Sequence, residues 1–194
     1  MSARERILAR VRDALAHRPP APHPGAFEGW RPTPLPDDAV AGFVETFTRA
    51  GGEVHRVPDA GAARVWIREL GWGLNGAAVG ATVPADLNPG LPVTPPEEAS
   101  LGISMARAAV GETGSLVLDA RDGRRTQLLP PVHVVFVRKS TVHRTLVEAL
   151  SALRPDLPSA LGLHSGPSKS ADIGQVLVKG VHGPGRVVAL LLEG

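Results

Sequence analysis

The chain has 194 residues, of which 43% are hydrophobic, a length that predicts one domain with room for a sizeable core. It contains no cysteine, which excludes disulfides, Cys-ligated zinc, iron–sulfur clusters and a thiol nucleophile in this chain. The 21 Lys and Arg residues exceed the 19 Asp and Glu residues by only two and form no dense block, so we do not expect nucleic-acid binding.

The N-terminal segment predicts an amphipathic helix over residues 3–17, because Ile7, Leu8, Val11 and Leu15 fall on one stripe. Its arginines permit a transit peptide, but the favoured interpretation is a surface helix of a cytoplasmic protein without a membrane span. Residues 18–36 contain seven prolines and predict an extended linker. The helix is therefore expected to be a tethered arm, through which the chain could form a homo-oligomer.

Helices and strands alternate after the linker. Asp37 or Asp38 can cap the first helix, and Gly51-Gly52 ends it. The predicted elements are a helix over 38–50, a strand over 53–57, a helix over 60–70 and a strand over 77–82. This β–α–β order predicts a parallel sheet with crossover helices.

The second half of the chain is richer in apolar runs. The run 132–137 is almost continuously apolar, as expected of a strand covered on both faces, and Asp122-Gly123 predicts a hairpin turn before it. The other expected strands and apolar runs are 106–110, 115–118, 173–181 and 187–192, with a helix near 141–153.

Gly111-Glu112-Thr113-Gly114 is the first of three clusters that could carry chemistry. Glycines on both sides of a carboxylate allow the backbone to approach a ligand closely. Glu112 could therefore act as a general base, a nucleophile or an acceptor for a hydroxyl group. The alternative is a polar turn residue satisfied by neighbouring amides.

The second cluster is Ser165-Gly166-Pro167-Ser168-Lys169-Ser170, followed closely by Asp172. Small residues before a possible helix offer free amides, and Lys169 adds a positive charge, a composition typical of an anion cradle. The glycine spacing does not match a phosphate-binding P-loop. The alternative is an ordinary loop in which Ser170 caps a helix.

The third cluster is the glycine-rich corner around His182, before the last strand. His182 could orient a substrate or shuttle a proton, or it could be structural, and the same alternatives hold for His133. The histidines form no H-x-H or H-x-x-x-H pair, so no metal site is predicted.

Three segments resemble a known family when they are taken together and in order. They are ARAAVGETGSLVL, LLPPVHVVFV and SGPSKSADIGQVLVKGVHGPGRVVALLLEG, within residues 100–194. This pattern is similar to the LUD domain of lactate-utilization protein C, the LutC/YkgG family. The resemblance implies an α/β fold, a three-layer sandwich with a mostly parallel sheet that is NagB/RpiA/CoA-transferase-like.

The resemblance also implies a role in oxidising L-lactate to pyruvate, beside two partner proteins that carry iron–sulfur clusters. Residues 1–36 are expected to be the amphipathic helix with its Pro-rich linker, and residues 37–194 the LUD domain. Glu112 and His182 become the candidate catalytic residues, no metal is implied, and the cofactor stays unknown. The candidate ligand contacts are Thr113, Gly114, Ser165, Gly166, Ser168, Lys169, Asp172 and Gly183.

Two functions stay open. The first is an accessory subunit of the lactate-oxidising complex that binds a small anionic ligand or cofactor. The second is a stand-alone CoA-transferase-like or nucleotide-binding enzyme that uses Glu112. If the chain is catalytic in the first case, it acts within an L-lactate dehydrogenase-type complex. In either case we expect the three clusters to meet in one pocket outside the carboxyl ends of the strands.

Overall fold

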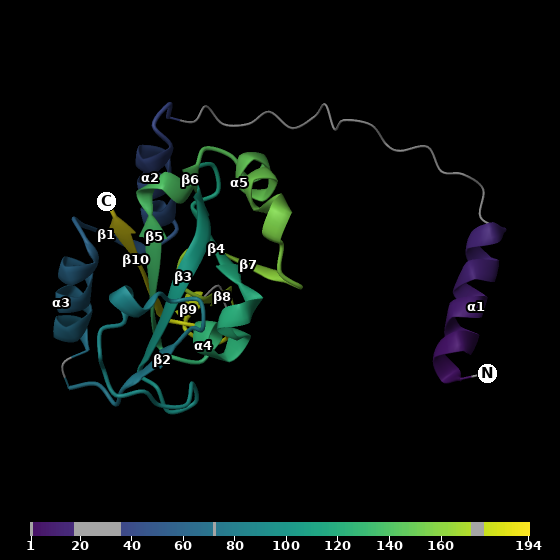
Figure 1. The fold of residues 1–194 in the computed structure, drawn as a ribbon, viewed down its shortest axis with the longest axis horizontal. Coiled ribbons are helices and arrows are strands. Elements are labelled where there is room, and N and C mark those ends of the chain that lie inside the picture. The colour runs from purple at the N-terminus through teal and green to yellow at the C-terminus, as the bar shows by residue number, and fades with distance from the viewer. Residues whose placement is uncertain (1, 18–35, 72, 172–176) are drawn as a thin grey trace. The chain divides into compact units, whose positions relative to one another are not determined.

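The computed structural model describes residues 2–17, 36–71, 73–171 and 177–194 (Figure 1). The chain divides into two compact units, Met1–Thr33 and Pro34–Gly194. Helix α1 (Ala3–Ala16) is the described element of the first unit. A capping box begins it, because Ser2 Oγ accepts from the Glu5 amide while the Glu5 carboxylate accepts from the Ser2 amide. No residue of α1 is buried, so its apolar stripe is exposed.

The second unit is built on one mixed sheet, in which eight strands of the described chain take part. Strands β1, β10, β5 and β3 pair in parallel in that order, and β4 and β7 extend the sheet with antiparallel pairs. Short strands β2 and β6 also pair with β3 in parallel. The bounds are β1 (Glu53–Val57), β2 (Ala77–Val79), β3 (Leu101–Val110), β4 (Ser115–Asp119), β5 (Val132–Arg138), β6 (Val142–His143), β7 (Leu161–His164) and β10 (Arg186–Leu192).

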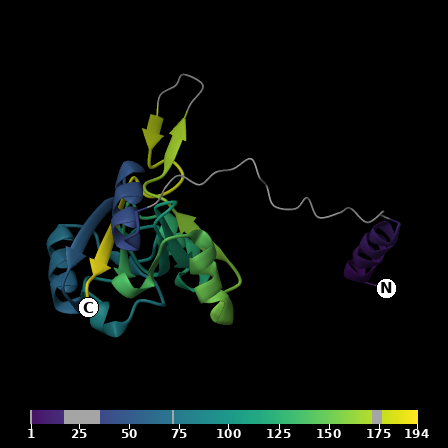
Figure 2. The same ribbon diagram turned by 90° about the horizontal axis from the view of Figure 1, so that it is seen from above.

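Helices cover both faces of this sheet and complete the predicted three-layer α/β sandwich (Figures 1 and 2). Helix α3 (Ala60–Leu70) packs Ile67 on the face that includes Phe136, and α2 (Ala39–Arg49) packs Phe43 and Phe47 on the opposite face. Neighbouring residues of β5 therefore enter different cores, as the period of a strand requires. This explains why the run 132–137 is almost continuously apolar.

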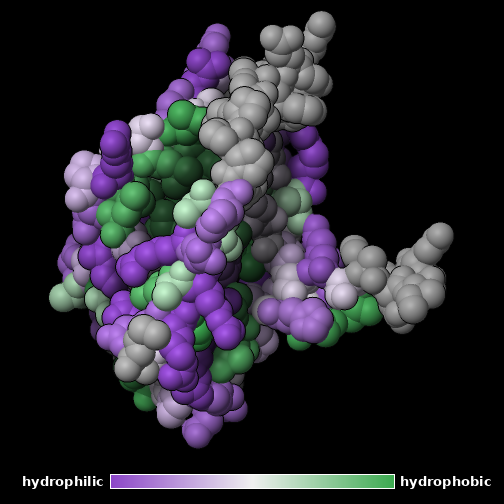
Figure 3. Space-filling model, turned by 90° about the vertical axis from the view of Figure 1, so that its right-hand side faces the viewer, coloured by the Kyte–Doolittle hydropathy of each residue, from purple (hydrophilic) through white to green (hydrophobic). Residues whose placement is uncertain are grey.

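Helix α5 (Leu146–Leu153) packs Ala149 and Leu153 into a third apolar cluster with β3 and β4. Its outer side is exposed, with 74% of Val147 accessible. In the space-filling view of Figure 3, green hydrophobic groups lie between purple hydrophilic ones. Strands β8 (Lys169–Ala171) and β9 (Leu177–Lys179) form a separate antiparallel hairpin that projects from the second unit (Figure 2).

The hairpin predicted at Asp122-Gly123 is wrong. Strand β4 pairs with β3 and β7, whereas β5 lies in parallel between β3 and β10. The connection between β4 and β5 is a 3-10 turn, η2 (Ala120–Asp122), followed by the short helix α4 (Arg124–Leu128). Asp122 is buried there and its Oδ1 accepts from the Thr82 amide at 2.7 Å, so the turn binds the segment after β2.

Other boundaries also differ from the sequence prediction, since the strand expected over 77–82 ends at Val79 and the run 106–110 belongs to a strand that begins at Leu101. The helix expected near 141–153 begins only at Leu146, because Thr145 forms its capping box with Glu148. The loop 165–170 leads into β8 rather than into a helix, so Ser170 does not cap one. The remaining short 3-10 helices are η1 (Ala85–Leu87), η3 (Lys139–Thr141) and η4 (Arg154–Asp156).

Candidate functional site

Glu112 lies in the tight turn between β3 and β4. Backbone hydrogen bonds to the segment before α5 hold this turn in place. The Gly111 and Glu112 amides donate to the carbonyls of His143 and Arg144 at 2.8 and 2.9 Å. Glu112 Oε1 in turn accepts from the Leu146 amide at 2.6 Å, at the first residue of α5. The carboxylate therefore satisfies a helix-start amide, which is the structural alternative for this residue.

The other residues of this turn reach toward the second cluster. Thr113 and Ser115 share a hydroxyl hydrogen bond of 2.7 Å, and Ser115 shares another of 2.7 Å with Ser165. Gly114 has a φ of +59° and lies against α2, where an added Cβ would be 2.6 Å from the Phe47 nitrogen. The turn thus positions the 165–170 loop through hydroxyl groups and not through Glu112.

The second and third predicted clusters meet directly. The Ser168 amide donates to the Pro184 carbonyl at 2.9 Å, and the Gly180 amide donates to the Ser168 carbonyl at 3.0 Å. Between these segments lies a cavity of about 310 Å³. Its lining includes five of the predicted residues, namely Ser165, Gly166, Ser168, His182 and Gly183.

Two other predicted residues, Lys169 and Asp172, are not among the described residues that line this cavity. Lys169 Nζ donates to the Ala50 carbonyl at the C-terminal end of α2, and Gly166 lies so close to Ala50 that a Cβ would be 2.9 Å from the same oxygen. The charge of Lys169 therefore supports a helix end. Asp172 lies outside the described residues.

The expected position at strand carboxyl ends holds only in part. The turn with Glu112 follows β3, and Ser165 follows β7. The corner with His182 instead precedes β10, next to Pro131 at the start of β5, so it lies at the amino ends of these strands. Glu112 lines neither the cavity at the Ser168 loop nor the two cavities that adjoin it.

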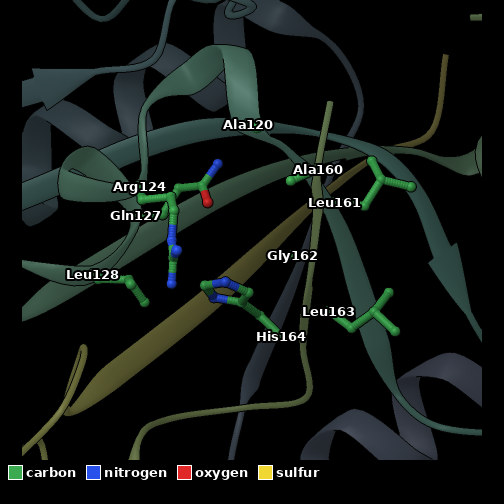
Figure 4. A pocket seen from close by; sticks show the side chains of 9 residues that line it. All are labelled: Ala120, Arg124, Gln127, Leu128, Ala160, Leu161, Gly162, Leu163 and His164. Carbon is green, nitrogen blue, oxygen red and sulfur yellow. The ribbon is translucent and has the colours of Figure 1, made fainter. Parts of the chain in front are cut away.

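These two further cavities adjoin the first around Leu128, which lines all three. One has about 630 Å³ and lies beside His182 and Lys179. The other has about 390 Å³ and is shown in Figure 4. Its polar lining side chains are Arg124, Gln127 and His164, none of which the sequence pattern singles out.

The two histidines in this region are held neutral by their surroundings. The rings of His133 and His164 lie edge to face with centroids 6.1 Å apart. His133 is fully buried, its Nε2 lies 3.0 Å from Ser104 Oγ, and its Nδ1 has no hydrogen-bond partner in the described part of the chain. Burial lowers the pKa of His133 to about 3, and burial also lowers the pKa of His164. Neither ring is charged at neutral pH.

Across the residues that the structure covers, no group of three or more His, Asp or Glu side chains is placed to hold a metal ion. In the same residues, no helix has the length and apolar character needed to cross a membrane.

The cavities around Leu128 lie in a part of the chain that matches a protein-family model. The family model described as LUD domain matches residues 97–192. The chain is 37% identical over 103 residues to lactate utilization protein C 1 of Bacillus mycoides (strain KBAB4), covering 49% of this chain and 44% of that protein. It is 35% identical over 105 residues to lactate utilization protein C of Bacillus subtilis (strain 168), covering 50% of this chain and 44% of that protein.

The match to these curated relatives thus spans less than half of their length. Among solved structures, a DUF162 family protein from Deinococcus radiodurans is similar with a TM-score of 0.60 and 22% identity. That similarity covers 82% of this chain and 100% of the other, and it supports the fold.

Proposed function

We propose, from the premise that this chain carries a LUD domain in residues 97–192 and belongs to that family, that it is an accessory subunit of a complex oxidising L-lactate to pyruvate. The observation that carries the proposal is the match of residues 97–192, which include β3 to β10, to the LUD domain model, together with the relatives named for lactate utilization. We place this activity in the cytoplasm.

The absence of cysteine supports the division of labour within such a complex. Oxidation of lactate releases two electrons, and a chain without cysteine lacks the usual ligands of an iron–sulfur cluster. The electrons must therefore pass to another group. We propose that partner proteins carry the iron–sulfur clusters, and that this chain binds a small anionic ligand in the cavities around Leu128.

The alternative of a stand-alone CoA-transferase-like or nucleotide-binding enzyme requires Glu112 to be available as a nucleophile. Its Oε1 accepts from the Leu146 amide, and the residue lines none of the three cavities. A nucleophile must lie within reach of its substrate. The geometry therefore favours the accessory subunit.

Affinity capture tests the proposal. The full chain with an affinity tag is produced in the organism that encodes it, captured from native extract during growth on L-lactate, and assayed for iron and for lactate-dependent reduction of a dye. We expect iron-containing partners in the captured material. The purified chain alone, as the matched control, should contain no stoichiometric iron and should not oxidise lactate. Capture without iron, or lactate turnover by the pure chain, would contradict the proposal.

A further inference from the structure

The cavity in Figure 4 lies between helix α4 and strand β7. Its apolar wall includes Leu128, Leu161 and Leu163. Three polar side chains face the same space, Arg124 and Gln127 from α4 and His164 from the end of β7. A largely apolar pocket with a few convergent polar groups is the usual form of a small-molecule site.

Arg124 is the permanently charged residue of this lining, and its guanidinium forms no hydrogen bond or ion pair with another described residue. Its neighbours differ in this respect. Arg121 pairs with the buried Asp119 and with Asp156, and Arg125 pairs with Glu97. Figure 4 shows the Arg124 side chain extending along the cavity toward His164. A guanidinium in this position offers two parallel donors to an oxyanion.

Gln127 and His164 supply neutral polar atoms beside this charge. Gln127 is buried and its Nε2 donates to the Asp119 carbonyl at 2.8 Å, which fixes the amide and leaves Oε1 on the side of His164 (Figure 4). A Cβ on Gly162 would lie 3.0 Å from His164 Nε2 and 3.7 Å from Gln127 Oε1. Glycine at position 162 therefore keeps open the space in which these two atoms converge.

We propose that this cavity binds a small monocarboxylate, whose carboxylate pairs with Arg124. A hydroxyl group of the ligand can donate to Gln127 Oε1, and a hydroxyl or keto oxygen can accept from the ring of His164. One cation and an apolar wall suit a monocarboxylate with a small apolar body. A phosphate would require more donors than this lining offers. The inference deepens the proposed function, on which it rests for the choice of L-lactate and pyruvate as probes.

Calorimetric titration of the purified full chain with L-lactate, pyruvate and inorganic phosphate tests this site. We expect the two carboxylates to bind and phosphate to bind at least about tenfold more weakly. Arg124→Gln should weaken carboxylate binding at least about tenfold, since it removes the charge and the fork of donors. Gly162→Ala should also weaken it, because the added methyl occupies the space between His164 and Gln127.

Arg125→Gln is the matched control, because Arg125 is adjacent in sequence, carries the same charge and does not line the cavity. Its carboxylate affinity should stay within about twofold of the original. The inference is overturned if Arg124→Gln binds carboxylates unchanged, if phosphate binds more tightly, or if neither carboxylate binds at about 10 mM. Affinity capture of iron-containing partners uses no added ligand and is therefore independent of the titration. If the partners are captured but the purified chain binds no carboxylate, this inference alone is overturned. Carboxylate binding that depends on Arg124 without such capture overturns the proposed function alone.

Discussion

Glu112 is a residue type that suggests catalysis, but in this structure its carboxylate binds a backbone amide. Both of its flanking glycines are in close contact with other segments, Gly111 with the carbonyls of Ala39 and Arg144 and Gly114 with Phe47. The glycines are therefore explained by packing and not by the approach of a ligand. The carboxylate then lies next to the first amide of α5 and accepts from it.

The variant Glu112→Gln measures this role. The amide can still accept from Leu146, but the negative charge at the helix start is lost, and we expect the free energy of unfolding to fall by about 1 kcal/mol. Binding of L-lactate and pyruvate should stay unchanged. Urea denaturation gives the stability, and Glu69→Gln on the exposed side of α3 is the control for a simple loss of charge. Loss of ligand binding at unchanged stability would instead assign Glu112 to the site.

His133 makes the stability of the second unit depend on pH. Its folded-state pKa is about 3, whereas an unfolded histidine titrates near pH ~6.5. Between these values the unfolded chain takes up a proton that the folded chain refuses. Stability is therefore lost as the pH falls below about 6.5, by up to about 1.4 kcal/mol per pH unit for this residue. His164, whose pKa burial also lowers, acts in the same direction.

Urea denaturation measured between about pH 7 and about pH 4 tests this dependence. The variant His133→Gln removes the titrating ring. We expect a flatter profile for this variant than for the unchanged chain. Equal slopes for His133→Gln and the unchanged chain would show that His133 is charged when buried. Burial raises the pKa of Asp119, but its bonds to Arg121 and Arg107 lower it overall, so its contribution is lost only at lower pH.

At the scale of elements, prediction succeeds where local signals are complete. Strand β1 and helix α3 have the predicted bounds, because Asp59 caps the helix and Gly71 follows its last residue. Prediction fails for α4, which has only five residues and therefore no readable period. The Asp-Gly pair before α4 wrongly indicates a hairpin turn, because the burial of Asp122 depends on a distant partner, Thr82.

Close packing of the β3–β4 turn on α2 leads to a prediction for glycine. Gly114 and Gly73 both have positive φ angles, +59° and +77°, so alanine is strained at either position. Only Gly114 also lies against backbone, since an added Cβ there would be 2.6 Å from the Phe47 nitrogen, while nothing lies within 4 Å at Gly73. Gly114→Ala should destabilise by more than about 2 kcal/mol and Gly73→Ala by about 1 kcal/mol. Equal losses in thermal denaturation would show that α2 can move away.

The arm gives a second prediction at this scale. Because α1 belongs to a separate compact unit, removal of residues 1–17 should leave the melting temperature of the second unit within about 2 °C of the original value. The exposed stripe of Ile7, Val11 and Leu15 should instead serve self-association or partner binding. Sedimentation of both forms measures the assembly state. An unchanged state with a large loss of thermal stability would make α1 part of the core.

At the scale of the whole molecule, topology decides which residues form the site. The motifs of the family resemblance are visible in the sequence, which also leads to the expectation that their three clusters meet in one pocket. The 165–168 loop and His182 do line one cavity, which Glu112 does not. Arg124 and His164 cannot be selected in this way, because only the pairing of β7 with β4 brings them to one cavity. No local pattern of residues records that pairing, so the polar lining of Figure 4 required the structure.

The central claim is that lactate oxidation depends on this chain without being performed by it alone. The most direct measurement is lactate-dependent dye reduction in extract of a strain of the source organism that lacks the chain, with and without added purified protein. We predict that the rate is lost in this extract and returns with the added full chain, but not with the Arg124→Gln variant. An undiminished rate in the extract that lacks the chain would contradict the account.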